Sequence, residues 1–255
     1  MTTDRTTDRT TDRMTADRGG AAPGRRGGAV AFFDVDETLV AMKNPFELVR
    51  YRLRGQGDDG SGYEEFVRPL RELAATGLEP VEVSRAFYRA LAGVSWFELC
   101  DLGRRWYADL RGRGVPFVAS TVAALREHQA RGHVTVAVSG AWAASLRPIT
   151  DDLGIDLVLC TEPELDQAGR LTGEVARPMF GAAKAVAVRS VLERYGADAR
   201  ACHAYADDST DLDMLDLVGH PTVVGDNRVL AEVAADRGWP VVPGGTVPGT
   251  ERLRV

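Results

Sequence analysis

The chain has 255 residues, of which 44% are hydrophobic, and its formal net charge is −6 at pH 7. This length and apolar content allow one large domain, or a core with a smaller inserted domain. The negative charge argues against a non-specific nucleic-acid binder, which would carry a basic face, and no apolar run approaches the ~20 residues that span a bilayer. Three widely spaced cysteines without a CxxC motif indicate reduced thiols, so we expect a cytoplasmic protein.

Residues 1–28 form a distinct N-terminal region. They repeat TTDR three times, continue with a Gly-rich stretch and contain no aromatic or branched aliphatic residue. Because such a segment has little apolar surface to bury, it is predicted to be a disordered tail. It also lacks the apolar stretch of a secretory signal. Met14 is an alternative to Met1 as the true start.

The next region begins with a short buried strand and continues with helical patterns. The strand is AVAFFDV, residues 29–35. Amphipathic helical patterns follow at 45–53, 63–74, 80–93 and 95–110. No strand-like alternation occurs between residues 45 and 112. We therefore predict a helical cap, residues 43–116, inserted after the first strand of a core made of residues 29–42 and 117–255.

Beyond Pro116 the pattern changes to alternating helices and strands. Helices are predicted at 118–132, between 140 and 156, at 181–196 and at 212–219, with a further helix before residue 239. Strands are predicted at 133–140, 156–160, 201–207, 221–225 and 239–242, and a β-hairpin at 164–175 with its turn near Ala168 and Gly169. Such alternation predicts an α/β fold, with a Rossmann-like parallel sheet covered by helices on both faces.

Polar side chains gather at the predicted carboxyl ends of strands, where ligands bind in open α/β sheets. The motifs are DVDET with Asp34 and Asp36, SG with Ser139 and Gly140, and DDSTD with Asp207, Asp208 and Asp211. Lys184 lies near the start of a helix. Acids and one ammonium converging on one edge predict a divalent-cation site that also holds a phosphate.

The order DVDET, SG, a lone lysine and DDSTD resembles the four motifs of the haloacid dehalogenase superfamily, over residues 30 to about 242. The helical insert and the hairpin before the lysine resemble its subfamily IB, which includes phosphoserine phosphatase. The resemblance implies a Mg²⁺-dependent phosphatase that hydrolyses a small-molecule phosphomonoester through an aspartyl-phosphate. Its partner would be that ester, with no nucleic acid and no membrane.

The resemblance also implies a role for each motif residue. Asp34 would be the nucleophile, and Asp36 would protonate the leaving oxygen and then activate water. Ser139 and the amide of Gly140 would hold phosphoryl oxygens. Lys184 would offset the charge of the nucleophile and the phosphate.

For the metal, the resemblance implies Mg²⁺ bound by Asp34, by the backbone carbonyl of Asp36 and by Asp207. Asp211 would orient a metal-bound water or the lysine. The spacing between Asp207 and Asp211 fits the family, but a shift by one residue would make Asp208 the ligand instead. Both assignments stay open at this point.

Lys43 lies nine residues after the expected nucleophile, at the entry to the cap. In phosphoserine phosphatases the corresponding position resembles a glutamate that holds the substrate's amino group. The reversed charge predicts that phosphoserine is a poor substrate and that a second anionic or hydroxyl-rich group is favoured. The alternative is that Lys43 points to solvent. Glu37, where many relatives have Gly or Ser, is expected to point away from the phosphate.

Three other functions remain alternatives: a phosphonate hydrolase that uses a cap lysine as a Schiff base, a phosphotransferase, and a non-catalytic binding protein. The acid at Asp36 suits a P–O leaving group better than a phosphonate. Two further predictions concern packing rather than catalysis. Trp96, Phe97, Trp106 and Tyr107 are expected in the core of the cap, and His203 is expected to be packed rather than catalytic.

Overall fold

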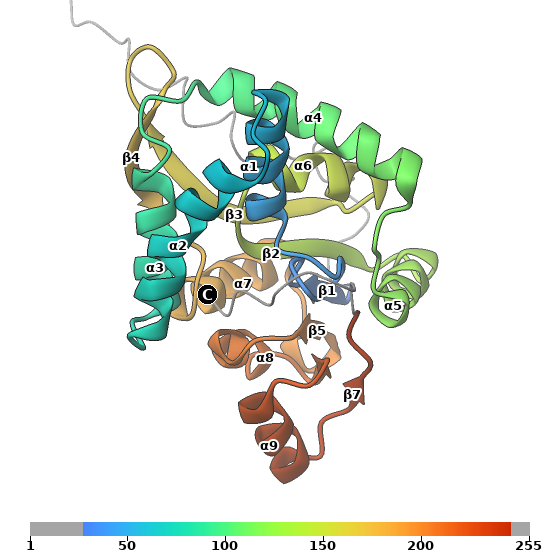
Figure 1. The fold of residues 1–255 in the computed structure, drawn as a ribbon. Helices are drawn as coiled ribbons and strands as arrows, with labels where there is room; N and C mark the ends of the chain where they lie inside the picture. Colours follow the sequence, from blue (N-terminus) through green and yellow to red (C-terminus); the bar gives the residue numbers. More distant parts are fainter. Residues whose placement is uncertain (1–27, 246–255) are drawn as a thin grey trace, which may run out of the picture.

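The computed structural model describes residues 28–245 and contains a seven-stranded sheet of order β4-β3-β2-β1-β5-β6-β7 (Figure 1). The strands are β1 (Val30–Phe33), β2 (Val134–Trp142), β3 (Leu157–Leu165), β4 (Leu171–Arg177), β5 (His203–Ala206), β6 (His220–Val224) and β7 (Val241–Val242). All neighbouring pairs are parallel except the antiparallel pair of β3 and β4. The predicted α/β class and parallel sheet are confirmed. The predicted tail lies outside the described residues, apart from Gly28.

Helices cover both faces of this sheet. They are α1 (Asn44–Gly55), α2 (Ser61–Ala75), α3 (Pro80–Arg89), α4 (Trp96–Arg113), α5 (Ala119–Ala130), α6 (Ala143–Asp152), α7 (Ala182–Tyr195), α8 (Leu212–Leu215) and α9 (Arg228–Arg237). Among the described residues, no helix is sufficiently long and apolar to cross a membrane.

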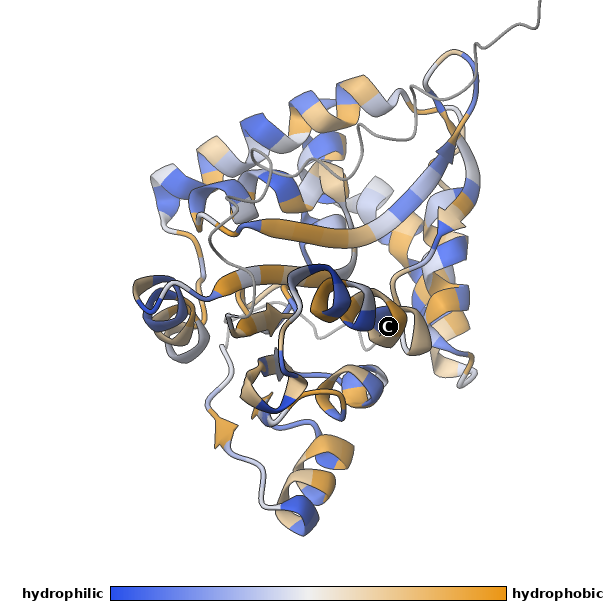
Figure 2. Cartoon of the chain, turned by 180° about the vertical axis from the view of Figure 1, so that it is seen from behind, coloured by the Kyte–Doolittle hydropathy of each residue, from blue (hydrophilic) through white to orange (hydrophobic). Residues whose placement is uncertain are grey.

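Strand β1 divides the core because its side chains alternate between two apolar clusters. Ala31 and Phe33 belong to the cluster that includes residues of α5, α6 and the helices α1–α4, whereas Val30 and Phe32 belong to the cluster that includes residues of α7, α8 and α9. The central strands are largely hydrophobic along their length (Figure 2). Because β1 is buried on both faces, its sequence is a continuous run of apolar residues.

Helices α1–α4, called the cap helices below, lie within the predicted insert, on the β3–β4 side of the sheet (Figure 1). Trp142 joins them to the sheet, since its ring centroid lies 5.6 Å from that of Phe87 and 5.4 Å from that of Tyr88. Trp96 adds a third ring at 5.8 Å. One apolar cluster therefore runs from β1 into the cap helices without interruption.

Several predicted elements have different bounds in the structure, among them β2 and α8. Strand β2 continues to Trp142, two residues past its predicted end, because its register with β3 shifts between Ser139 and Trp142 and resumes at Thr161. Helix α8 is a single turn that ends at Leu215 rather than at residue 219. The predicted hairpin is confirmed, with Gly169 at a φ of 71° in its turn.

The cap-core prediction is confirmed for two residues of α4 and wrong for one. Trp106 and Tyr107 are 3% and 5% exposed, and Trp96 is partly buried against the core cluster. Phe97, however, is 76% exposed. The buried face of α4 contains Leu99, and Phe97 lies two residues before it, which places its side chain on nearly the opposite side of a helix with 3.6 residues per turn.

Candidate active site

The predicted site residues lie around one cavity of about 100 Å³ between the sheet and the cap helices. It is lined by side chains from several elements, including Asp34, Asp36, Lys43, Ser139, Gly140, Lys184, Asp207, Asp208 and Asp211. Asp34 directly follows β1 and Asp207 directly follows β5, two neighbouring parallel strands. The backbone amide of Asp34 donates a hydrogen bond to the carbonyl of Tyr205 at 2.9 Å, which ties the two strand ends together.

Lys184, in the first turn of α7, lies between two carboxylates. Its Nζ is 2.7 Å from Oδ1 of Asp34 and 2.8 Å from Oδ2 of Asp211, and its side chain is only 4% exposed. Burial by itself would lower the pKa of Lys184, but the carboxylates of Asp211 and Asp34 outweigh it and raise that pKa. The lysine therefore stays charged and keeps one oxygen of Asp34 engaged.

Asp36 lies in the tight turn that follows β1. Within this turn the amides of Thr38, Leu39 and Val40 all donate to the carbonyl of Val35. The carboxylate of Asp36 accepts hydrogen bonds from the backbone amide of Asn44 at 3.2 Å and from its side-chain amide.

Burial raises the pKa of Asp36 to about 8, although the charge of Lys43 opposes the shift, and the neighbouring Asp34 contributes to the increase. The raised pKa favours the protonated form of Asp36, which is the form able to donate a proton.

Asp207 and Asp208 have different surroundings. The hydroxyl of Thr38 donates to Oδ1 of Asp207 at 2.7 Å, and burial together with the charge of Asp34 raises the pKa of Asp207 well above its ordinary value. Asp208 instead accepts from the backbone amide and the hydroxyl of Thr210, at 2.9 and 2.8 Å. These bonds cap the short helical turn Ser209–Asp211. Asp207 is therefore buried close to the charge of Asp34, while Asp208 serves as a cap.

Ser139 and Gly140 lie where β2 and β3 lose their register. The Ser139 hydroxyl oxygen accepts a hydrogen bond from the amide of Ala141 at 3.2 Å, so its proton is free to be donated elsewhere. A Cβ at Gly140 would lie 2.5 Å from the ring of Phe180, which also lines the cavity. A side chain at this position would therefore require the Phe180 ring to move.

Lys43 and Glu37 form an ion pair of 2.9 Å, with side chains 23% and 27% exposed. Both line a second, outer cavity of about 510 Å³. Lys43 and Asp207 line the inner cavity as well as the outer one. Glu37 lines the outer cavity and not the inner one, so the expectation that it points away from the phosphate stays a prediction. Lys43 is paired with Glu37 rather than simply pointing to solvent. Glu37 adopts a φ of 61°, a left-handed conformation that glycine reaches without strain and other residues disfavour.

Comparison with known proteins assigns the chain to a family. A model of haloacid dehalogenase-like hydrolases matches residues 31–216. The chain belongs to this hydrolase family. A probable phosphatase of Mycobacterium tuberculosis is 30% identical to it, with 88% of this chain and 77% of the relative covered. An "Inhibition of morphological differentiation protein" of Streptomyces azureus is 31% identical, with 83% and 77% covered.

Solved structures share the fold of this haloacid dehalogenase-like chain. A Bordetella pertussis protein of unknown function superposes with a TM-score of 0.74 at 25% identity, covering 85% of this chain and 98% of that one. A phosphoserine phosphatase superposes with a TM-score of 0.61 at 21% identity, covering 81% and 91%, which shows a common fold. The family and the phosphatase relative support phosphoric monoester hydrolysis as the activity.

The donor atoms suit a hard divalent cation. Burial and the charge of Asp34 raise the pKa values of Asp36 and Asp207, and a cation among the carboxylates would relieve that repulsion. Among the described residues, the carboxylates of Asp34, Asp36 and Asp207 do not form a group of three whose ligand atoms all lie within 4.8 Å of one another. A site that uses the Asp36 carbonyl and waters in addition to two carboxylates agrees with this, because Mg²⁺ usually keeps several waters.

Three residues of this site were not predicted from the sequence. Thr38 holds Asp207, Asn44 holds Asp36, and Phe180 closes the cavity over Gly140. Thr38 lies inside DVDET, so its position in the motif offered a signal. Asn44 and Phe180 offered none, because their contacts depend on how the cap and the loop before α7 fold back over the sheet.

Proposed function

We propose that this chain is a Mg²⁺-dependent phosphatase that hydrolyses a small-molecule phosphomonoester through a phosphoryl intermediate on Asp34. The observation that carries the proposal is the position of Lys184 between Asp34 and Asp211, in the cavity that Asp36 also lines and where burial raises the pKa of Asp36. An ionised nucleophile, a fixed cation and a proton donor are the groups that phosphoryl transfer to a carboxylate needs.

In the first step Asp34 attacks phosphorus. One Asp34 oxygen stays bound to Lys184, and the other forms the new bond to phosphorus while the bond from phosphorus to the ester oxygen breaks. Asp36 donates its proton to that leaving oxygen, so an alcohol departs and Asp36 becomes a carboxylate. The hydroxyl of Ser139 and the amide of Gly140 hold phosphoryl oxygens at the bulge of β2, where the ring of Phe180 limits the space.

In the second step water replaces Asp34 on phosphorus. Asp36, now a carboxylate, accepts a proton from the water as its oxygen bonds to phosphorus, and the Asp34–phosphorus bond breaks. Asp34 returns as a carboxylate beside Lys184, and Asp36 is again protonated. Atoms and charges therefore balance over one turnover, with water consumed and an alcohol and phosphate released.

Asp34, Asp207 and the backbone carbonyl of Asp36 would hold Mg²⁺. When bound, the ion would neutralise charge on the phosphoryl oxygens and on the surrounding carboxylates. Thr38 supports this assignment because its hydroxyl fixes the orientation of the Asp207 carboxylate. The capping bonds of Asp208 favour Asp207 as the ligand.

The phosphonate hydrolase is disfavoured because its Schiff base needs a neutral lysine. The chain has two lysines, Lys43 and Lys184. Burial alone would lower the pKa of Lys43, but the carboxylates of Glu37 and Asp207 outweigh it and raise that pKa. A protonated amine has no lone pair with which to attack a carbonyl.

Lys43 and Glu37 would select the substrate at the mouth of the inner cavity. A second anionic group on the substrate would compete with Glu37 for Lys43, and an ammonium group would compete with Lys43 for Glu37. Because Lys43 is also attracted by Asp207 and Asp36, we propose that its charge faces the reacting end and disfavours the ammonium of phosphoserine. The leaving group would extend into the outer cavity of about 510 Å³.

A panel of phosphorylated metabolites, assayed with Mg²⁺ and with excess chelator, tests this function. We expect hydrolysis of at least one ester with Mg²⁺, no hydrolysis in chelator, and weak activity when Ca²⁺ replaces Mg²⁺, since Ca²⁺ prefers more ligands. Full activity in excess chelator would refute the metal assignment. Adding alcohol acceptors and following transfer of the phosphoryl group would distinguish a phosphotransferase from a phosphatase.

A further inference from the structure

All four histidines of the chain gather at one place, although they are up to 92 residues apart in the sequence. His128 lies on α5, His133 lies directly before β2, and His203 and His220 are the first residues of β5 and β6. Parallel strands start at the edge of the sheet opposite to their carboxyl ends. The histidines therefore lie at the other end of β5 from Asp207.

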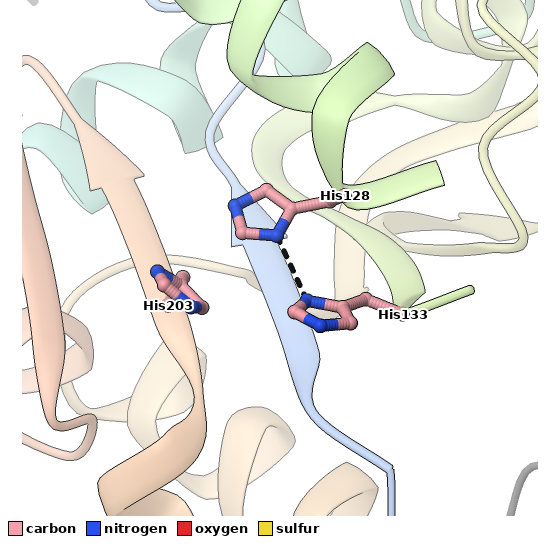
Figure 3. A group of neighbouring side chains, drawn as sticks. All are labelled: His128, His133 and His203. Carbon is pink, nitrogen blue, oxygen red and sulfur yellow. Dashed lines mark hydrogen bonds between the residues drawn. The ribbon is translucent and has the colours of Figure 1, made fainter. Parts of the chain in front are cut away.

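Three of the rings point toward one another (Figure 3). Nδ1 of His128 is 2.9 Å from Nδ1 of His133, and one ligand nitrogen from each of His128, His133 and His203 lies within 4.8 Å of the other two. In the sheet register His203 pairs with Ala31 of β1. His203 and His128 have ring centroids 4.4 Å apart.

The contact between the two Nδ1 atoms restricts what lies between them. Two ring nitrogens at 2.9 Å cannot both carry a proton, so they share either one proton or one metal ion. The other nitrogen of His128 lies 3.0 Å from the hydroxyl of Tyr205. If this nitrogen donates its proton to Tyr205, the lone pair on Nδ1 faces His133, as in metal sites where an outer hydrogen bond fixes the tautomer.

We propose that His128, His133 and His203 form a binding site for a divalent transition-metal ion, with Zn²⁺ as the best fit. Neutral imidazoles are preferred by Zn²⁺, whereas Mg²⁺ and Ca²⁺ prefer oxygen ligands. Tetrahedral zinc with ordinary Zn–N bonds separates its ligand nitrogens by about 3.3 Å, which lies between the 2.9 Å contact and the 4.8 Å limit of this group.

Charges around the site are compatible with an ion. Arg131 is the cation that lies close by on the turn after α5, and its guanidinium pairs with Glu127 at 3.6 Å. His220 stacks on His203 with ring centroids 4.6 Å apart and is exposed, so it shields one side without belonging to the group of three. A water would complete the coordination on the exposed side.

The site would stabilise the scaffold of the active site without touching the substrate. An ion bound there ties α5 to β5, and β5 continues into Asp207. The hydroxyl of Tyr205 contacts His128. The backbone carbonyl of the same residue accepts the hydrogen bond from the amide of Asp34. The proposal concerns metal binding by these histidines and does not depend on the reaction at Asp34.

Titration of the metal-free full-length protein with Zn²⁺ tests the proposal. We compare the wild type with His133→Ala and His203→Ala, two partly exposed positions whose variants should fold, as thermal melting without metal will verify. His220→Ala is the matched control outside the group of three. Asp207→Asn reports any Zn²⁺ that binds at the active site. Co²⁺ serves as a second probe, because its absorption spectrum reports a tetrahedral site with nitrogen ligands.

We expect one Zn²⁺ per chain with micromolar or tighter affinity, and a rise in Tm on binding. His133→Ala and His203→Ala should each weaken this binding by about a hundredfold or more, and should lose the tetrahedral Co²⁺ spectrum. His220→Ala and Asp207→Asn should retain both. No tight Zn²⁺ binding by the wild type, or binding that is lost in Asp207→Asn and kept in His133→Ala, would overturn the proposal.

Discussion

The ammonium of Lys184 lies 2.7 Å from a carboxylate oxygen of Asp34, and the two side chains are 4% and 9% exposed. They are 150 residues apart in the sequence and meet because α7 begins beside the carboxyl end of β1. At so low an exposure the attraction is little screened by water, so the pair fixes the orientation of the proposed nucleophile.

Replacing Lys184 by Met should lower kcat/KM by about 10²–10³, the usual cost of removing one donor that stabilises transition-state charge. Arg should not restore activity, because a planar guanidinium does not fit a buried site shaped for a compact ammonium. Arg189→Ala, on the exposed side of the same helix, is the control and should have wild-type kinetics. A Met variant with more than about a tenth of the wild-type kcat/KM would contradict this role.

Asp207→Asn and Asp208→Asn should have different effects. Asp207→Asn should abolish Mg²⁺-dependent turnover, because it removes a ligand charge held in place by Thr38. Asp208→Asn should reduce turnover less than Asp207→Asn does. Asp208→Ala removes the cap that Asn would partly keep, so it should lower the free energy of unfolding by about 0.5–2 kcal/mol. Steady-state kinetics over a range of Mg²⁺ concentrations and denaturant unfolding measure the two effects. If Asp208→Asn is the more damaging to turnover, Asp208 is the ligand.

Substitutions in the Lys43–Glu37 pair should change substrate preference in opposite directions. Lys43→Glu should weaken kcat/KM for the true substrate by about 1–3 kcal/mol, the scale of a charge-assisted contact. Glu37→Gln should raise kcat/KM for esters with a second anionic group, because Lys43 is then released from its 2.9 Å partner. The wild type should hydrolyse phosphoserine poorly. Efficient phosphoserine hydrolysis would refute this role of Lys43 and leave the chemistry of Asp34 untouched.

The histidine cluster should make the fold sensitive to acid. Burial, together with neighbouring histidines, lowers the pKa of His128 and of His203 to about 4. The unfolded chain takes up these protons near pH 6.5 and the folded chain only near pH 4, so stability falls as the pH decreases from about 6.5 to about 4. In chelator, the free energy of unfolding of His203→Gln should fall by about 1 kcal/mol less than that of the wild type over this pH range. This difference is small because the ring of His203 is partly exposed to solvent. If the free energy of unfolding changes with pH by the same amount in both proteins, His203 is not a source of the acid sensitivity.

The sequence predicted the order of strands and helices because β1 and its neighbours are buried on both faces and read as apolar runs. It also predicted that Asp34, Ser139, Lys184 and Asp207 meet, since the carboxyl ends of parallel strands share one edge of the sheet. The extension of β2 to Trp142 was missed because a register shift depends on the partner strand and not on local composition.

The remaining differences depend on tertiary contacts. The ion pair between Glu37 and Lys43 follows from the left-handed turn at Glu37, a conformation that the residue type itself disfavours. The exposure of Phe97 depends on which face of α4 meets the sheet. The gathering of His203 with the other histidines had no sequence signal, because ligand spacing within the chain is long and irregular.

The most direct test of the mechanism is the identification of a phosphoryl group on Asp34. Asp36→Asn should slow hydrolysis of the intermediate, since an amide cannot accept the proton of the attacking water. Acid quenching of this variant during turnover, followed by peptide mass spectrometry, should detect a hydroxylamine-sensitive phosphoryl adduct on the peptide that contains Asp34. Asp34→Asn should show no adduct and less than about a hundredth of the wild-type rate. An adduct on another residue, or substantial turnover by Asp34→Asn, would contradict nucleophilic catalysis by Asp34.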